Sequence, residues 1–165
     1  MRKKIWLSLL LAISLVITFY VGYIIGDKSN GLLTPNAANK AIQSRWVNEK
    51  EPPLPQILIE GVNINVYRSS YSWCTPSSGK NSDTSCVAVD ASIPEITPTI
   101  VPAGSMIETL APNGIKQFTL SNRTEGFDGD PYIVPTNKGI YLYHIHCEWF
   151  LDQGQSDYYF SIEVA

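Results

Sequence analysis

The sequence GIYLYHIHCEWF at residues 139–150, followed by SDYYFSIEV at residues 156–164, decides the fold. In the first segment the odd positions from 141 to 149 carry only Tyr, Ile, Cys and Trp, while the even positions include two His and a Glu. In the second segment the large apolar residues stand at the even positions from 158 to 164. An apolar residue at every second position is typical of a strand with one buried face. The two segments are therefore predicted to be strands of one hairpin.

The same pattern constrains how the two strands pair. Residues that stand directly opposite each other share a face of the sheet. Because the inward positions are odd in one segment and even in the other, the numbers of paired residues must sum to an odd value. The turn is expected at Asp152, Gln153 and Gly154.

Further strands are predicted on the N-terminal side of this hairpin. Val62, Ile64 and Val66 alternate with polar residues. Other short strands are expected at residues 86–90, 105–110, 115–121 and 132–134, separated by breaks rich in Pro or Gly. About seven short strands with frequent turns predict an all-β fold, an antiparallel Ig-like β-sandwich.

An N-terminal transmembrane helix is predicted to precede this domain. Residues 5–26 hold no charged side chain and follow Arg2, Lys3 and Lys4. As a helix they would extend roughly 33 Å, which is enough to cross the hydrocarbon core of a bilayer. The basic cluster marks the cytoplasmic side. Residues 1–26 are thus interpreted as a cytoplasmic tip and single-pass anchor in the cell membrane, with the C-terminal domain extracellular.

A cleaved signal peptide is the alternative interpretation of this segment. Its apolar core is normally about 7 to 15 residues long and is closely followed by a cleavage site between small residues. The apolar stretch here is longer, and the residues after Gly26 are Asp27, Lys28, Ser29 and Asn30. These features favour an uncleaved anchor over a secreted chain.

Residues 27–56 are predicted to form a stalk or linker. They include four prolines and show no sustained periodicity. A short helix within residues 37–48 is an alternative, because Ala38, Ile42 and Trp46 follow a spacing of four. The β-sandwich domain is then expected at residues 57–165.

The charge of the expected domain excludes one class of partner. Residues 57–165 hold five basic and twelve acidic side chains, a net charge of −7. An acidic surface repels phosphate backbones, and the sequence has no basic stripe. We therefore expect no nucleic-acid partner.

The three cysteines are assigned different roles. Cys74 and Cys86 flank eleven mostly polar residues and are predicted to form a disulfide, which suits an oxidising exterior. Cys147 shares the apolar face of its strand, so it is expected to be a free thiol in the core. A thiol nucleophile would need an activating His on its own side of the sheet, whereas both histidines lie at positions of opposite parity.

The histidines raise the question of a metal site. Residues 143–147, Tyr-His-Ile-His-Cys, are similar to the His-rich copper motifs of cupredoxin-type sandwiches. A blue-copper loop also needs a His and a Met after the Cys, and residues 148–152 supply neither. A weaker hypothesis remains, that His144, His146 and Glu148 converge on one divalent ion such as zinc or copper. The alternative is that the histidines are solvated outward positions supported by Asp157 or other polar residues across the hairpin.

Two other motifs are interpreted without a specific function. Asp128 and Asp130 lie in a Gly-rich loop that could hold Ca²⁺ but offers too few ligands, so a plain turn is expected. Asn122, Arg123 and Thr124 match the N-glycosylation pattern, which matters only in a eukaryotic secretory route.

The domain resembles a group of uncharacterised extracytoplasmic β-sandwich domains that are anchored to the membranes of Gram-positive bacteria. The likeness covers residues 57–165 and rests on structural motifs: Tyr-Ser-Trp-Cys at 71–74, Cys-Val-Ala-Val-Asp at 86–90, and Gly139, Tyr141, Tyr143, Trp149, Tyr158, Phe160, Ile162 and Val164. The resemblance implies a location and a fold, and brings no activity with it.

These observations favour a noncatalytic extracytoplasmic binding or interaction module over an enzyme. The aromatic residues and Cys147 are assigned to the core, which leaves no acid–base pair and no activated nucleophile. The expected partner is an envelope protein or a cell-wall component, and no cofactor is expected. The alternative is a divalent-metal-binding domain that uses His144 and His146.

Overall fold

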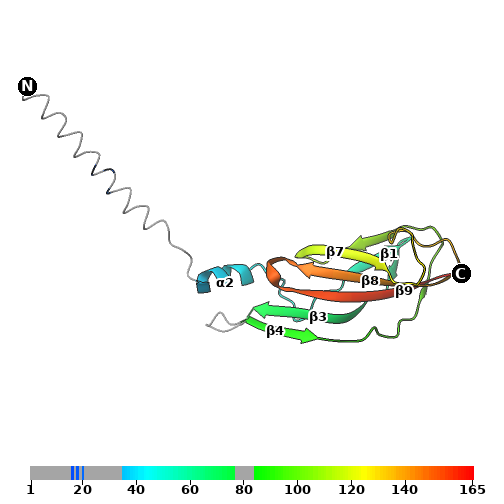
Figure 1. Cartoon of the computed structure of the whole chain (residues 1–165), viewed down its shortest axis with the longest axis horizontal. Coiled ribbons are helices and arrows are strands. Elements are labelled where there is room, and N and C mark those ends of the chain that lie inside the picture. Colours follow the sequence, from blue (N-terminus) through cyan, green and yellow to red (C-terminus); the bar gives the residue numbers. More distant parts are fainter. Residues whose placement is uncertain (1–15, 17, 19, 21–34, 77–83) are drawn as a thin grey trace, which may run out of the picture. The chain divides into compact units, whose positions relative to one another are not determined.

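The computed structural model describes Val16, Thr18, Tyr20 and residues 35–76 and 84–165 (Figure 1). Apart from Val16, Thr18 and Tyr20, the predicted membrane span at residues 5–26 lies outside the described residues. Within the described part, no helix has both the length and the apolar character needed to cross a membrane.

Antiparallel strands dominate the described chain, which confirms the all-β prediction. Within residues 35–76 and 84–165, helical structure is limited to α2 (Pro35–Gln43) and to the short 3₁₀ helix η1 (Phe150–Asp152). The strands are β1 (Gln56–Ile59), β2 (Val62–Ile64), β3 (Tyr67–Pro76), β4 (Thr84–Val89), β5 (Thr99–Ile100), β6 (Ile107–Leu110), β7 (Ile115–Asn122), β8 (Gly139–Trp149) and β9 (Gly154–Val164).

The strands form two sheets. The larger sheet has the order β4-β3-β9-β8-β7, and β5 pairs in parallel with the end of β9. The smaller sheet has the order β2-β1-β6. Figure 1 shows β8 and β9 running side by side along the length of the larger sheet.

The predicted register of the last hairpin is confirmed. β8 and β9 pair from Gly139 opposite Val164 to Glu148 opposite Gln155, and every pair of numbers has an odd sum. The turn, however, starts earlier than expected, because η1 makes it and Leu151 and Asp152 adopt positive φ angles of 58° and 53°.

Both sheets contribute to a single hydrophobic core. The larger sheet supplies Trp73 and Trp149, whose rings meet edge to face with centroids 5.0 Å apart. It also supplies the stacked pair Tyr143 and Phe160, whose ring centroids are 4.8 Å apart. The smaller sheet supplies three fully buried isoleucines: Ile57, Ile59 and Ile107. Aromatic pairs of this kind add about 0.5–1.5 kcal/mol each beyond the area that they bury.

The predictions for the cysteines are confirmed. Cys74 and Cys86 stand directly opposite each other on β3 and β4 and form a disulfide, with Cα atoms 4.0 Å apart. Cys147 is a free cysteine with no exposed surface. The alternation in β8 therefore places its thiol in the core, as expected.

Residues 46–53, expected in the stalk, contact the sheets closely. The indole nitrogen of Trp46 donates a hydrogen bond to the Leu151 carbonyl oxygen at 3.0 Å. In the other direction, Trp73 donates to the Glu49 carbonyl at 2.9 Å and Tyr158 donates to the Pro53 carbonyl at 2.8 Å. The compact unit that contains the sheets begins at Asn39. Helix α2 (Pro35–Gln43) overlaps the first part of the stretch 37–48 where a helix was the alternative.

Two strand predictions need correction. β3 was not expected, because its inward positions include Ser69 and do not form an apolar run. The strand predicted at 132–134 is reduced to one bridge between Met106 and Ile133. Pro131 and Pro135 flank that bridge, and a proline has no N–H with which to extend a ladder.

Candidate functional site

The three predicted metal ligands lie on the face of β8 that points away from the core. Pairing with β9 places Asp157 opposite His146 and Tyr159 opposite His144. Strand β7 places Ser121 opposite His144 on the other side. The sequence therefore brings these polar side chains together through the register of three neighbouring strands.

One oxygen of Asp157 binds both histidines. Its Oδ1 lies 2.8 Å from Nε2 of His144 and 2.8 Å from Nδ1 of His146. Burial by itself raises the pKa of the Asp157 carboxyl, but hydrogen bonds from His146 and His144, together with their charge, outweigh it and lower that pKa. The carboxylate therefore stays ionised and orients both rings.

Arg123 determines which nitrogen of His144 carries the proton. Its Nη2 lies 3.2 Å from Nδ1 of His144. Since a guanidinium only donates hydrogen bonds, Nδ1 accepts here and the proton of neutral His144 is on Nε2, where it is donated to Asp157. Both ring nitrogens are thus occupied, and His144 has no lone pair available for a metal ion.

The other two predicted ligands are engaged to different extents. Nε2 of His146 lies 3.7 Å from Oε1 of Glu148, beyond hydrogen-bond distance. The second oxygen of Glu148 forms an ion pair with Lys116 at 3.2 Å. Across the described ranges, no group of three or more His, Cys, Asp or Glu side chains is arranged to hold a metal ion.

The alternative prediction for the histidines also needs refinement. Support from Asp157 was foreseen, but His144 is only 9% exposed and is therefore not a solvated position. The Tyr159 ring lies 4.9 Å from its imidazole. Arg123, which comes from the end of β7, had no signal in the sequence that would link it to this cluster.

The Cys147 thiol is unsuited to nucleophilic chemistry. Burial, assisted by the negative charge of Asp157, raises the pKa of Cys147 to about 12. A reactive cysteine needs a lowered pKa and some exposure to solvent. This residue therefore acts as part of the core.

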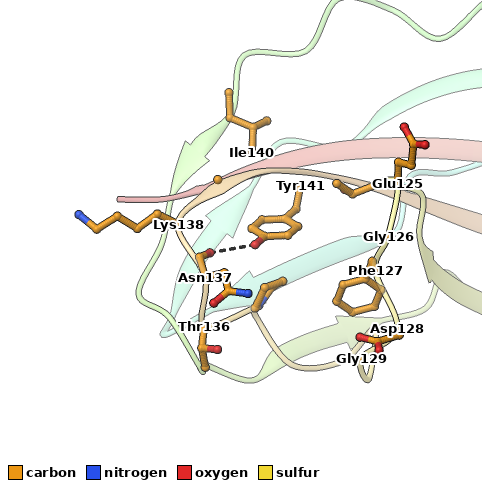
Figure 2. A pocket seen from close by; sticks show the side chains of 13 residues that line it. Glu125, Gly126, Phe127, Asp128, Gly129, Thr136, Asn137, Lys138, Ile140 and Tyr141 are labelled. Atoms are coloured by element: carbon orange, nitrogen blue, oxygen red, sulfur yellow. Dashed lines mark hydrogen bonds between the residues drawn. The ribbon is translucent and has the colours of Figure 1, made fainter.

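A pocket of about 490 Å³ lies at the end of the larger sheet where β8 begins (Figure 2). This volume is in the range of about 300–1,000 Å³ that is usual for small-molecule sites. The two ends of the single connection between β7 and β8, residues 123–138, form the pocket together with the start of β8, and most of its lining residues are exposed. Its lining includes Phe127, Asp128, Asn137, Lys138 and Tyr141.

Contacts with the connection between β7 and β8 hold the aromatic rings of the pocket in place. The Tyr141 hydroxyl donates a hydrogen bond to the Asn137 carbonyl oxygen at 2.9 Å. The Phe127 ring lies over Gly129, where an added Cβ would come within 3.1 Å of the ring. Glycine at position 129 therefore leaves room for Phe127 to lie against the loop.

Comparison with family models, with curated proteins and with solved structures finds no match to this chain.

The pocket and the point where the chain enters the compact unit lie at opposite ends of one strand. β8 runs from Gly139, which lines the pocket, to Trp149, which precedes the turn that binds Trp46 and Val47. Eleven residues in a strand span roughly 35 Å. Residues 126–131 were expected to form only a turn, because the irregular connection between β7 and β8 that forms the pocket has no periodic pattern.

Proposed function

We propose that this chain is a noncatalytic, membrane-anchored extracytoplasmic module, built as an Ig-like β-sandwich, that binds an envelope component through the pocket where β8 begins. The observation that carries this proposal is the separation along β8. The chain enters the domain at one end, and the pocket opens at the other. A domain that is tethered at its entering end presents its far end to partners.

Three features of the chain support the anchor and the compartment. Residues 5–26 are uncharged and follow three basic residues, which is the pattern of a single-pass span with a cytoplasmic N-terminus. The disulfide between Cys74 and Cys86 suits an oxidising exterior. In this arrangement the acidic domain and the basic cluster lie on opposite sides of the membrane.

The noncatalytic part of the proposal is supported by the state of the reactive side chains. His144 is fixed between Arg123 and Asp157, and the Cys147 thiol is buried. The carboxylates that line the pocket, Glu125 and Asp128, are both exposed. An acid catalyst is normally held in an apolar site that keeps it protonated.

Membrane topology is tested with an epitope tag placed after Ala165. We expect the tagged chain to remain with membranes after carbonate extraction, and the tag to bind antibody on intact cells. A matched variant that lacks residues 5–26 should lose membrane association. Release of the chain into the medium with a mature N-terminus beyond residue 26, or a tag that is inaccessible from outside, would overturn the anchored arrangement.

Binding through the pocket end is tested by photo-crosslinking in living cells. A benzoylphenylalanine is placed at Ile140, which lines the pocket, or at Phe150 in the turn at the other end of β8. The two positions are matched, since their side chains are 59% and 57% exposed. We expect a crosslink to an envelope component from position 140 and none from position 150. Equal crosslinks from both positions, or none from position 140, would contradict the proposal.

A further inference from the structure

The pocket is lined by both polar and apolar groups. Figure 2 shows the rings of Phe127 and Tyr141 on either side of the space, with the Asn137 amide near it; the Asp128 carboxylate, which also lines the pocket, lies beside Gly129 next to the Phe127 ring. The Lys138 side chain points away from both rings. The interior therefore combines two aromatic surfaces with one amide and one carboxylate.

This set of groups matches the chemistry of a sugar. A pyranose ring has an apolar face of C–H groups, which packs against an aromatic ring, and an edge of hydroxyls that both donate and accept hydrogen bonds. A carboxylate accepts hydrogen bonds from two hydroxyls, while an amide both donates and accepts. The half-buried rings of Phe127 and Tyr141 are already held by contacts with the connection between β7 and β8, so little conformational entropy is lost when a ligand binds.

The charges in the lining argue against an anionic ligand. Glu125 and Asp128 outnumber the one basic lining residue, Lys138, and the domain as a whole is acidic. A phosphate or a uronic acid would be repelled, since sites for such anions are normally built from Arg or Lys. A neutral ligand meets no such cost.

We infer that the pocket between Phe127 and Tyr141 binds a neutral saccharide, with the hydroxyls held by Asp128 and Asn137. This inference rests on the proposed function and specifies its ligand as an envelope glycan. The open rim of the pocket suits a short stretch of a longer glycan. A peptide ligand would instead need main-chain partners along an extended groove, and the pocket is confined to the connection between β7 and β8 and the first residues of β8.

The inference is tested by titrating the ¹⁵N-labelled full chain in detergent micelles with neutral saccharides. The probes are N,N′-diacetylchitobiose, chitohexaose, cellobiose and maltose, with glucuronic acid as the anionic comparison. We expect at least one neutral probe to shift the amide resonances of Gly126, Gly129 and Asn137, and glucuronic acid to bind more weakly. The variants Phe127→Ala and Asp128→Ala should each weaken binding about tenfold or more, the usual effect of losing a hydrogen bond to a charged group or a stacking ring.

Two controls keep the outcome interpretable. Phe150→Ala removes an exposed aromatic ring near the other end of β8 and should leave the affinity unchanged. Asp128 is exposed, so its replacement should not unfold the domain. If no neutral saccharide shifts these resonances, or if the shifts occur away from the pocket, the inference is overturned. If position 140 gives a crosslink but no saccharide binds, the saccharide ligand is wrong and the proposed binding function stands. If position 140 gives no crosslink and no saccharide binds, both proposals are wrong.

Discussion

The side chain of Gln153 pairs with the main chain of Val47 as a neighbouring strand would. Val47 N–H donates to Oε1 of Gln153 at 2.8 Å, and Nε2 of Gln153 donates to the Val47 carbonyl at 2.7 Å. Gln153 is only 1% exposed, so water cannot replace these bonds. We expect Gln153→Ala to lower the free energy of unfolding by about 2–4 kcal/mol, because it leaves both main-chain groups of Val47 without partners. Urea unfolding followed by tryptophan fluorescence measures this loss.

Gln155→Ala is the matched control for this substitution. Gln155 lies two residues further along β9 and is exposed, so its truncation should change the unfolding free energy by less than about 0.5 kcal/mol. Equal effects of the two substitutions would mean that the link to Val47 does not stabilise the domain.

A second prediction concerns the pH dependence that Asp157 confers. Its pKa is lowered in the folded chain, so the stabilisation is complete above the pKa of the unfolded carboxyl, about 3.9. It is lost as pH falls through the lower pKa of the folded state. We expect Asp157→Asn to cost about 1–2 kcal/mol at pH 7, a value reduced because the side chain is one-third exposed. The difference from the parent chain should disappear toward pH 2 in urea unfolding.

Glu108→Gln serves as the control for this titration. Glu108 is an exposed residue of β6, and its substitution should give a small difference that does not change with pH. A difference between Asp157→Asn and the parent chain that persists at pH 2 would show that the carboxylate is not the source of the stabilisation.

A third prediction concerns the disulfide. It closes a loop with a sequence separation of 12 residues, and the chain-entropy model assigns about 3 kcal/mol to a closure of this size. We expect the double variant Cys74→Ser/Cys86→Ser to lose up to that amount in urea unfolding. The parent chain treated with dithiothreitol should show the same loss, while the double variant should not respond to the reductant. A reductant effect in the double variant would point to another cause.

A fourth prediction concerns the reactivity of Cys147. Because burial raises its pKa to about 12, almost no thiolate forms at pH 8 and the native chain should not react with Ellman's reagent. In guanidinium chloride one thiol per chain should react, and the Cys147→Ala variant should release none. Rapid labelling of the native chain would show that the β8 face is open to solvent.

The alternation of inward and outward side chains along β8 and β9 was the part of the fold that the sequence predicted best. The alternation around Cys147 correctly predicted its burial, the register of β8 with β9, and the separation of the thiol from His144 and His146. Parity works here because one face of each strand is buried, so a slip of one residue would expose the whole apolar set. The disulfide was predictable for a similar reason, since a polar loop between two cysteines has no other means of stabilisation.

Interactions between distant segments were not predictable in this way. Trp73 and Tyr158 donate hydrogen bonds to carbonyl oxygens of Glu49 and Pro53, and a main-chain acceptor leaves no mark in the sequence. The contact between the long side chain of Arg123 and His144 on the neighbouring strand was not predictable either. The pocket was not predicted because the connection between β7 and β8 that forms it has no periodic pattern.

The hydrogen bonds at the turn after β8 also determine how the domain would respond to mechanical load. A partner held at residues 139–141 and a membrane that holds the chain before Val47 would pull on β8 and β9 along their length. Their hydrogen bonds would then be loaded in parallel and would have to shear together, instead of opening one after another as in a peeled hairpin. β7 on one side and β3 on the other extend this ladder, so under the proposed function the domain would remain folded under tension between an envelope partner and the membrane.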